Sequence, residues 1–321
     1  MIAALFWLSV GAIVYTYLGY PLLVTLLART RPRPQPYPPA TPAITLLIAA
    51  YNEQAVIARK LENSLALDYP RHRLQILVAA DGSDDRTPEI VRQYAEQGVE
   101  LVYQPQRRGK MAAINRAIGA ARGEIVVFSD ANNLYEPSAL RHLIAPFADP
   151  QVGAVSGAKI ILDGDGALGE SEGLYWKYES YIKEQETRLG SCTGVAGEIL
   201  AVRRSLFQPP PEEIINDDFY LALQTIRQGY RVVYAPQACV WHKIEAAERT
   251  DSWVYVYLMT RNRLLYLKCI GAKPWTTALA IVDLLRTALS WSLKPRHRHM
   301  RPAASALTRG IRDFVTGHFG P

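Results

Sequence analysis

The chain has 321 residues and a formal net charge of +6, with 49% hydrophobic and 21% charged residues. This length accommodates one large α/β domain with membrane elements, or two small domains. The positive charge lies mainly beside two apolar segments, which favours anionic lipid head groups as a partner and argues against nucleic acid. The three cysteines form no CxxC pair, so we expect reduced packing residues in a cytosolic compartment.

The first apolar segment, residues 1–28, has no charged side chain and is long enough to cross about 30 Å of hydrocarbon. A signal peptide carries basic residues in front of its apolar region, whereas Arg29, Arg31 and Arg33 follow this one. We therefore expect an uncleaved transmembrane anchor, with the rest of the chain in the cytoplasm. Residues 29–42 are rich in proline and predict an extended linker.

Residues 43–268 alternate between short apolar runs and helical patterns, which predicts an α/β fold with a mostly parallel sheet and right-handed crossovers. The first five predicted strands are 43–50, 75–80, 99–103, 124–129 and 153–158. The helices predicted between them are 53–67, 87–97, 110–121 and 137–147. Beyond them we expect an irregular helix over 170–188, a strand over 198–202, a helix over 217–229 and a last strand over 231–234.

A second apolar stretch, residues 275–293, is interrupted by Asp283 and Arg286. These charges favour an amphipathic helix at the membrane interface over a clean span. The basic residues Lys294, Arg296, Arg298 and Arg301 follow it. We expect residues 269–321 to form a membrane-associated segment.

Polar turns follow several of the predicted strands. Ala50, Tyr51 and Glu53 come at the end of the first strand, and Asp81 ends the second. Ligands of open parallel sheets bind at the carboxyl ends of the strands, so Asp81 is a candidate acceptor of hydrogen bonds from a base or a sugar. The alternative for the first turn is an ordinary helix cap by Asn52.

Three further groups carry chemistry. Lys110 begins a helix after a glycine turn, which suits a phosphate, although a solvated basic loop is the alternative. Asp130 and Asn132 follow the fourth strand and offer hard oxygen donors for Mg²⁺ or Mn²⁺, although Asp and Asn also make turns. His242 follows the last strand and is either a metal ligand or a surface histidine.

Asp217 and Asp218 open a predicted helix. Acidic residues there are stabilised by the helix dipole, which is the structural alternative. Adjacent carboxylates can also raise the pKa of one of them, which suits a general base.

Together these motifs resemble the inverting glycosyltransferases of family 2, in the cellulose-synthase-like bacterial branch, over Ala43 to Lys268. The motifs that carry the resemblance are AAYNE (49–53), ADGSDD (80–85), RRGKMAAIN (107–115), SDAN (129–132), TGVAGE (193–198), NDDFYLAL (216–223) and RNR (261–263). The ordered set is specific, whereas no single motif is.

The resemblance implies a GT-A fold, a nucleoside-diphosphate sugar donor, with a UDP-sugar expected, and inversion by single displacement with Asp218 as the base. It assigns donor binding to Ala50, Tyr51, Glu53, Asp81, Lys110, Asp130, Arg261 and Arg263. It assigns the acceptor side to Thr193, Gly194, Gly197, Glu198 and Asp217. It assigns Mg²⁺ or Mn²⁺ to Asp130 and Asn132, with His242 as the further candidate ligand. The expected acceptor is lipid-linked or a glycan, at the cell inner membrane with the catalytic domain in the cytoplasm.

Two departures from the family pattern bear on function. Asn132 replaces the second aspartate of the DxD motif, and the QxxRW motif of polymer-making members is missing. The alternatives are a processive polysaccharide synthase, against which the missing QxxRW argues, and a non-catalytic scaffold with a degenerate fold, which Asn132 favours. A nucleotidyltransferase is a further alternative, which the helix opened by Asp217 and Asp218 fits less well. The intact Asp81, Asp130 and Asp218 argue against the scaffold.

Overall fold

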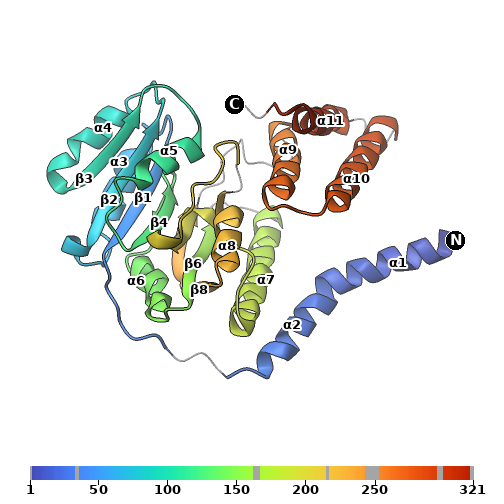
Figure 1. The fold of residues 1–321 in the computed structure, drawn as a ribbon, viewed down its shortest axis with the longest axis horizontal. Helices are drawn as coiled ribbons and strands as arrows, with labels where there is room; N and C mark the ends of the chain where they lie inside the picture. Colours follow the sequence, from blue (N-terminus) through green and yellow to red (C-terminus); the bar gives the residue numbers. More distant parts are fainter. Residues whose placement is uncertain are drawn as a thin grey trace.

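The computed structural model describes residues 2–32, 36–161, 167–214, 217–242, 253–294 and 299–318. Its centre is one eight-stranded sheet in the order β3-β2-β1-β4-β7-β6-β8-β5 (Figure 1). The strands are β1 Ile44–Ala50, β2 Leu74–Asp81, β3 Val99–Gln104, β4 Ile125–Asp130, β5 Asn133–Tyr135, β6 Val152–Ile161, β7 Leu200–Arg203 and β8 Arg231–His242.

Helices cover both faces of this sheet and extend from it at either end of the chain (Figure 1). They are α1 Ile2–Val14, α2 Tyr20–Arg29, α3 Ile57–Leu65, α4 Thr87–Gln93, α5 Lys110–Ile118, α6 Ala139–Ile144, α7 Ala167–Leu189, α8 Asp217–Arg227, α9 Trp253–Cys269, α10 Pro274–Leu293 and α11 Arg301–Thr316.

The first half of the sheet is the predicted βα alternation. Strands β1 to β4 pair in parallel. The continuous apolar runs of β1, β2 and β4 are buried on both faces, whereas β3, at the edge of the sheet, is mostly half-buried. Helices α3, α4 and α6 contribute to the core on one face, while α5 and α8 contribute to the core on the other. This arrangement brings the carboxyl ends of β1, β2 and β4 to one edge.

The second half of the sheet is mixed and differs in detail from the prediction. Strand β7 runs antiparallel to both β4 and β6, and the three-residue strand β5 was not predicted. Strand β8 continues eight residues past the predicted end at Tyr234, through Pro236, to His242. Its pairing with β6 shifts register between Ser156 and Ala158, so Pro236 lies in a bulge, where proline is tolerated.

Helix α7 is one continuous helix of 23 residues, although the sequence predicted an irregular one. Its side chains hold α2: the hydroxyl of Tyr20 bonds to Glu186, and Thr25 lies 2.8 Å from the hydroxyl of Tyr181. The hydroxyl of Tyr178 donates to the backbone carbonyl of Tyr17 at 2.7 Å. The N-terminal helix is therefore docked against α7 as well as connected to the rest of the chain through residues 30–43.

The C-terminal helices form a cluster of their own. Helices α9, α10 and α11 share an apolar core that includes Leu264, Leu284 and Leu307. Helices α9 and α11 were not predicted individually, and α9 packs mainly within this cluster. The expected division of the chain at residue 268, like the other domain boundaries, stays a prediction.

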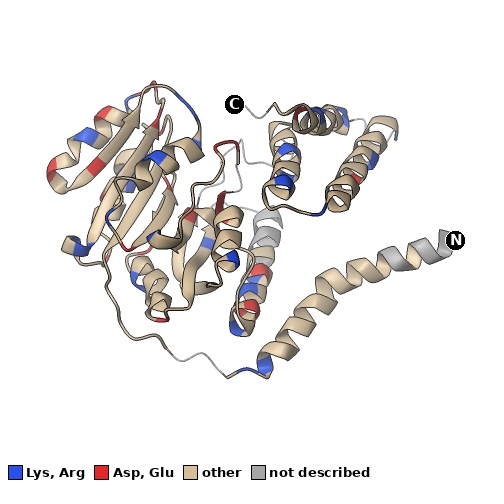
Figure 2. Cartoon of the chain, in the orientation of Figure 1, with Lys and Arg blue, Asp and Glu red and all other residues tan. Residues whose placement is uncertain are grey.

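By length and composition alone, one helical stretch among the described residues could cross a membrane, Val10–Arg29, with a mean hydropathy of 1.7. Figure 2 shows no charged residue in the described part of α1 and α2 before Arg29. A five-residue π-helical turn, Tyr15–Gly19, joins the two helices, and the axis bends there (Figure 1).

Candidate functional site

A cleft of about 310 Å³ lies where β1, β2 and β4 end. The predicted donor-binding residues Ala50, Tyr51, Glu53, Asp81, Lys110 and Asp130 line it, together with Asn132. The cleft is further lined by Ala49, Ala79, Arg107, Gly109 and Ala113. The fold thus brings residues that lie more than 80 positions apart in the sequence into one cavity.

Asp81 organises the basic turn that borders the cleft. Its buried carboxylate accepts hydrogen bonds from the backbone N–H groups of Arg108 and Gly109, each at 2.7 Å, and pairs with Arg116 at 3.3 Å. Gly82 has a φ of +67°, and a Cβ there would lie 2.5 Å from Cβ of Arg107. Glycine is therefore required for this close approach.

Arg107 lies over the ring of Tyr51 at the cleft. The guanidinium carbon lies 3.6 Å from the centre of the tyrosine ring, a favourable cation–π contact. The sequence placed Arg107 in a basic turn suited to phosphate but did not predict this contact, because a basic residue in a loop gives no sign of an aromatic partner 56 positions earlier. The exposed planar surface is of the kind on which a nucleobase stacks.

Asn52 does not cap α3, which begins only at Ile57. Its side chain instead bonds to Asp84, with the amide donating to the carboxylate at 2.7 Å and the Asp84 backbone N–H donating back at 3.1 Å. The first and second polar turns are therefore tied to each other beside the cleft.

Lys110 joins the donor cleft to the acidic start of α8. Its Nζ lies 2.8 Å from Asp130 and 3.7 Å from Asp217. Burial alone would lower the pKa of Lys110, but the carboxylates of Asp130, Asp217 and Asp218 raise it above its usual value. The amine is therefore a permanent cation between two groups of carboxylates.

Burial raises the pKa of Asp218 to about 7, and the adjacent negative charge of Asp217 adds to the rise. A hydrogen bond from the Phe219 backbone N–H and the charge of Lys110 oppose it, whereas Glu198 reinforces it. Burial likewise raises the pKa of Asp217, against the charge of Lys110. Asp218 therefore has the proton affinity that a base needs near neutral pH.

The glycine-rich segment 193–198 lies between α8 and α7. Gly197 faces Asp218, since a Cβ on the glycine would lie 3.3 Å from Cβ of the aspartate. Glu198 forms an ion pair with Lys159. Thr193 is held by Glu186 of α7, which accepts its backbone N–H at 3.0 Å, and Gly194 lies against Lys183 of the same helix. Of the four predicted acceptor-side residues in this segment, Gly197 and Glu198 thus adjoin the Asp217–Asp218 pair.

A buried lysine lies behind the Asp130–Asn132 turn and was missed by sequence reasoning. Lys60 is 1% exposed and donates to Ser129 Oγ at 2.8 Å and Asn133 Oδ1 at 2.6 Å. Its Nζ also lies 4.4 Å from the centre of the Tyr135 ring. Burial lowers the pKa of Lys60 to about 7, while the charge of Asp130 opposes part of that fall. The amine therefore binds the residues on both sides of the turn, Ser129 before it and Asn133 after it.

Two predicted site residues lie elsewhere, and the side chain of a third is not described. Among the described residues the donor cleft is not lined by Arg261 or Arg263: Arg261 is buried within the C-terminal cluster beside Tyr257, and Arg263 lines a separate cavity. The backbone of His242 pairs with Asn133 at the end of β8, but its side chain lies outside the described residues. Asn216 of the acidic motif also lies outside them.

The donor set at the cleft fits a hard divalent cation. Asp130 and Asn132 both line the cavity, and the ammonium group beside Asp130 shows that the carboxylate is placed to hold a positive charge. The described residues contain no cluster of three or more His, Cys, Asp or Glu side chains suited to a metal. A cation held here would complete its shell with substrate oxygens and water, as Mg²⁺ commonly does.

Comparison with known structures establishes the fold. A mannosyltransferase of Pyrobaculum calidifontis, solved with GDP-mannose and Mn²⁺, superposes with a TM-score of 0.68 at 25% identity, covering 96% of this chain and 98% of that one. The structure of GalNAc-T7 with UDP, GalNAc and Mn²⁺ gives a TM-score of 0.59 at 16% identity, over 98% and 66% of the two chains. The predicted GT-A fold is thereby confirmed.

Curated relatives are synthases of polysaccharides and glycolipids. Poly-β-1,6-N-acetyl-D-glucosamine synthase of Staphylococcus aureus (strain COL) is 30% identical over 204 residues, which cover 62% of this chain and 49% of the relative. β-Monoglucosyldiacylglycerol synthase of Trichormus variabilis is 28% identical over 217 residues, which cover 65% and 46%. The chain thus spans about half the length of the curated relatives it matches.

The sequence also matches the model of the family described as "Glycosyltransferase like family 2" over residues 41–263. This range contains all the strands of the sheet, the donor cleft and the acidic start of α8. The fold, the relatives and the family model agree with the resemblance and with the predicted enzyme class: the chain is a glycosyltransferase that belongs to the glycosyltransferase-like family 2.

Proposed function

We propose that this chain is a membrane-anchored, inverting glycosyltransferase that moves a sugar from a nucleoside-diphosphate sugar to a lipid-linked or polysaccharide acceptor in cell-envelope or exopolysaccharide synthesis. The catalytic domain lies on the cytoplasmic side of the inner membrane in this proposal. A UDP-sugar is the expected donor, with GDP-sugars as the next class to test.

The observation that carries the proposal is the position of Lys110 between Asp130 and Asp217, at 2.8 and 3.7 Å. It links the cleft at the strand ends to the helix that Asp217 and Asp218 begin. A diphosphate in the cleft and an acceptor hydroxyl at Asp218 would therefore lie on neighbouring sides of one cation, as a single displacement needs.

In this proposal Asp218 takes the proton of the acceptor hydroxyl as that oxygen attacks the anomeric carbon. The bond to the diphosphate breaks on the opposite face, so the configuration inverts. Lys110 stabilises the charge that develops on the departing diphosphate, and Asp81 fixes the turn that carries Lys110. The pKa of about 7 at Asp218 suits this proton transfer.

Asp130 and Asn132 would hold a divalent cation, which supplies electrostatic stabilisation of the leaving diphosphate when it is bound. Two solved neighbours contain Mn²⁺, which supports Mn²⁺ or Mg²⁺ as the ion to test here. Because Asn132 stands where a second carboxylate is usual, we expect weaker metal binding than in members with two aspartates.

The name of the Staphylococcus aureus relative favours one second candidate, a processive polysaccharide synthase. The missing QxxRW motif argues against it. Product length separates the two, because a single-transfer enzyme adds one sugar to each acceptor whereas a processive enzyme makes long chains without short intermediates.

The proposal is tested with the purified full chain, Mn²⁺ or Mg²⁺ and a panel of UDP- and GDP-sugars. Release of nucleoside diphosphate identifies the donor, and NMR of the product reports the anomeric configuration. We expect one donor class to be consumed and the configuration to invert. Release from no donor, in the presence of membrane lipids and either metal, would favour the degenerate scaffold.

A further inference from the structure

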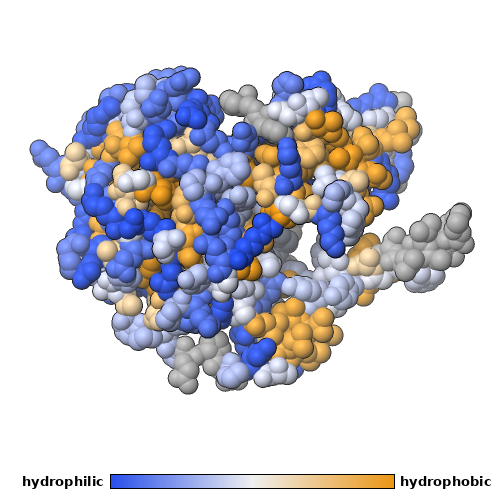
Figure 3. Space-filling model, in the orientation of Figure 1, coloured by the Kyte–Doolittle hydropathy of each residue, from blue (hydrophilic) through white to orange (hydrophobic). Residues whose placement is uncertain are grey.

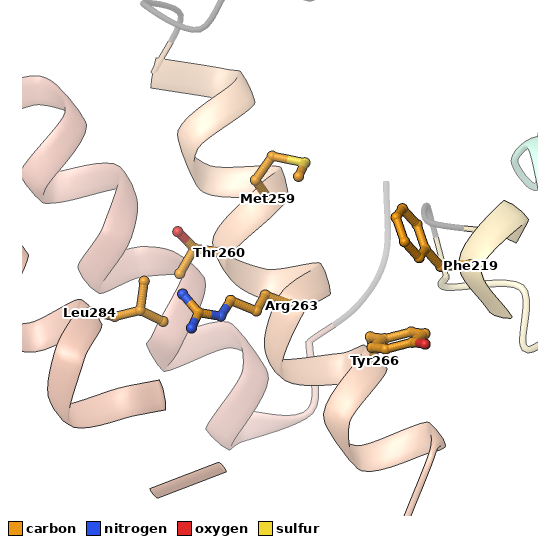
Figure 4. Close-up of a pocket in the computed structure, with 6 residues that line it drawn as sticks. All are labelled: Phe219, Met259, Thr260, Arg263, Tyr266 and Leu284. Carbon is orange, nitrogen blue, oxygen red and sulfur yellow. The ribbon is translucent and has the colours of Figure 1, made fainter. Parts of the chain in front are cut away.

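A cavity of about 1000 Å³ lies between the proline-rich linker, the C-terminal end of α7 and the first half of β8. It shares no lining residue with the donor cleft. A smaller cavity of about 440 Å³ among α8, α9 and α10 has one charged lining residue, Arg263 (Figure 4). The large cavity, in contrast, is lined by two carboxylates and two guanidinium groups, those of Asp149, Glu184, Arg188 and Arg231.

Two of these four ionic groups are occupied by the fold. Arg231 lies 3.2 Å from Asp149 and donates to the backbone carbonyls of Gly190 at 2.8 Å and Thr187 at 3.4 Å. Asp149 also accepts the backbone N–H of Gln151 at 2.8 Å. This pair therefore holds the wall of the cavity and has little capacity left for a ligand.

The other two groups, Glu184 and Arg188 of α7, have open hydrogen-bonding capacity. They are four residues apart, a spacing at which opposite charges often pair, yet within the described chain they form no ion pair with each other. Partial burial raises the pKa of Glu184, and no described cation opposes the rise. The Nε of Arg188 is buried without a partner among the described residues, and its Nη1 reaches only Gln185 Oε1, at 3.4 Å.

The cavity adjoins the end of the candidate membrane span Val10–Arg29. Pro32, in its wall, is three residues beyond Arg29, so the chain separates them by at most about 10 Å. Figure 3 shows hydrophobic atoms gathered over α2, where Leu22 and Leu26 are exposed, and over the C-terminal helices. The exposed stripe on α10 consists of Trp275, Leu279, Val282, Leu289 and Leu293.

The charges of the cavity indicate which ligand fits. A guanidinium group binds phosphate oxygens well, and a carboxylate binds an ammonium group. A head group that carried only negative charge would be repelled by Glu184 and Asp149. A head group with both a phosphate and a primary ammonium satisfies Arg188 and Glu184 together.

We propose that this cavity binds the phosphoethanolamine head group of a membrane phospholipid, with the phosphate on Arg188 and the ammonium on Glu184. The lipid as its source rests on the proposed membrane anchoring. The acyl chains lie along the exposed face of α2. The bound lipid takes no part in sugar transfer; it holds the end of α7 and the linker at the bilayer surface.

Calorimetry with the full chain in detergent micelles tests this site without a need for catalysis. The probes are dihexanoyl phosphatidylethanolamine, dihexanoyl phosphatidylglycerol, which lacks the amine, and glycerophosphoethanolamine, which lacks the acyl chains. We expect phosphatidylethanolamine to bind about tenfold more tightly than phosphatidylglycerol, because one charge-assisted hydrogen bond is worth about that factor. Glycerophosphoethanolamine should bind at least about tenfold more weakly than the lipid, because it buries no hydrocarbon.

Substitutions on α7 separate the two charges. Arg188→Gln should lower the affinity for both lipids about tenfold or more. Glu184→Gln should lower the affinity for phosphatidylethanolamine to that of phosphatidylglycerol, whose own binding should not weaken. The control is Lys177→Gln, on the same helix but outside the wall of this cavity, which should leave both affinities within twofold.

Equal affinity of the parent for the two lipids, or unchanged binding in Arg188→Gln, would overturn the site. Binding of glycerophosphoethanolamine as tight as that of the lipid would overturn the membrane source. Release of nucleoside diphosphate by the same preparations separates these failures from a failure of the proposed function. A chain that turns over donor without this lipid selectivity is a glycosyltransferase that lacks the site.

Discussion

Asp217 and Asp218 are adjacent, yet the structure gives their carboxyl groups different partners. Lys110 lies 3.7 Å from Asp217, whereas Asp218 accepts a hydrogen bond from the Phe219 backbone and faces Gly197. We expect Asp218→Asn to lower transfer about 100- to 10,000-fold, because general-base catalysis contributes about that much. Donor affinity, measured by calorimetry, should stay within a few fold. Near-normal turnover would remove Asp218 from the mechanism.

The pH dependence of transfer should follow the same carboxyl group. Only the deprotonated form of Asp218 accepts a proton, and its pKa is about 7. We therefore expect kcat/KM to rise as the pH increases from 6 to 8 and to level off above, measured with saturating metal. A rate that is flat over this interval would assign the base to another group.

The raised pKa also has a consequence for stability. The unfolded chain ionises Asp218 near its ordinary value of 3.8, so the folded state loses stability as the pH rises from there to about 7. Asp218→Asn removes this loss. The gain in Tm of the variant over the parent should thus be larger at pH 8 than at pH 5, and an equal gain at both would contradict the assignment.

The Asp130–Asn132 turn makes a separate prediction about metal. Asp130→Ala should abolish metal-dependent donor binding, whereas Asn132→Asp should tighten the binding of Mn²⁺, because a second carboxylate adds charge to a hard-cation site. Titration of Mn²⁺ by calorimetry measures both. Unchanged affinity in both variants would mean that the turn is only structural.

Lys60 supports that turn from behind through Ser129 and Asn133. Lys60→Met keeps much of the side-chain volume but leaves both polar partners buried without the amine, which costs about 1–3 kcal/mol each. We expect a lower Tm and weaker Mn²⁺ binding. The control is Arg59→Met on the same helix, which should leave both unchanged. Equal Mn²⁺ affinity in the Lys60 variant would limit the lysine to a role in folding.

Residue types and their order allowed much of the site to be predicted. Asp81, Lys110 and Asp130 follow or precede regular elements at places where an open parallel sheet binds ligands, and the structure brings them into one cleft. Lys60 and the contact of Arg107 with Tyr51 were missed because the partners come from distant parts of the chain. A lysine in a helical pattern gives no sign in one sequence that its amine is buried.

At the scale of elements, continuous apolar runs predicted β1, β2 and β4 well, because strands buried on both faces need such runs. Strand β5 has three residues, too few for an alternating or apolar pattern to be recognised in the sequence. Strand β8 was predicted to end at Tyr234 because Pro236 is unfavourable within a strand, but the proline lies in a bulge and the strand continues. Helix α7 was predicted as irregular because the segment is long, aromatic and charged. Its order comes from tertiary contacts with α2 and β8.

Helix α10 makes a prediction about membrane binding. Removing residues 1–42 deletes the apolar N-terminal helix, but the exposed stripe on α10 remains. We expect the truncated chain to stay partly with membranes in low salt and to be released further in high salt, as judged by fractionation. The control is Leu279→Glu with Leu289→Glu in the truncated chain, which should make it soluble. A truncated chain that is wholly soluble in low salt would show that α10 is not a membrane element.

The whole molecule has the donor cleft on one side of the sheet edge and the C-terminal helices beside α8 (Figure 1). No local pattern in the sequence predicts that α9 packs with α11, because contacts such as Tyr257 with Asp313 and Thr260 with Gly310 join residues 50 or more positions apart. The same arrangement puts Phe219 of α8 opposite Tyr266 of α9. The acceptor side of the enzyme is therefore a product of tertiary packing.

The docking of α2 on α7 sets the immersion depth of the enzyme, in the proposed membrane-bound state. The partners of Tyr20 and Thr25 are polar groups of α7, so this half of the apolar helix is held at the level of the catalytic domain. The candidate span Val10–Arg29 includes this docked half, so the face of α2 that meets the hydrocarbon is the one opposite α7, where Leu22 and Leu26 are exposed. The depth of the catalytic domain relative to the membrane is then fixed by the side-chain contacts between α2 and α7. The length of the proline-rich linker does not change this depth.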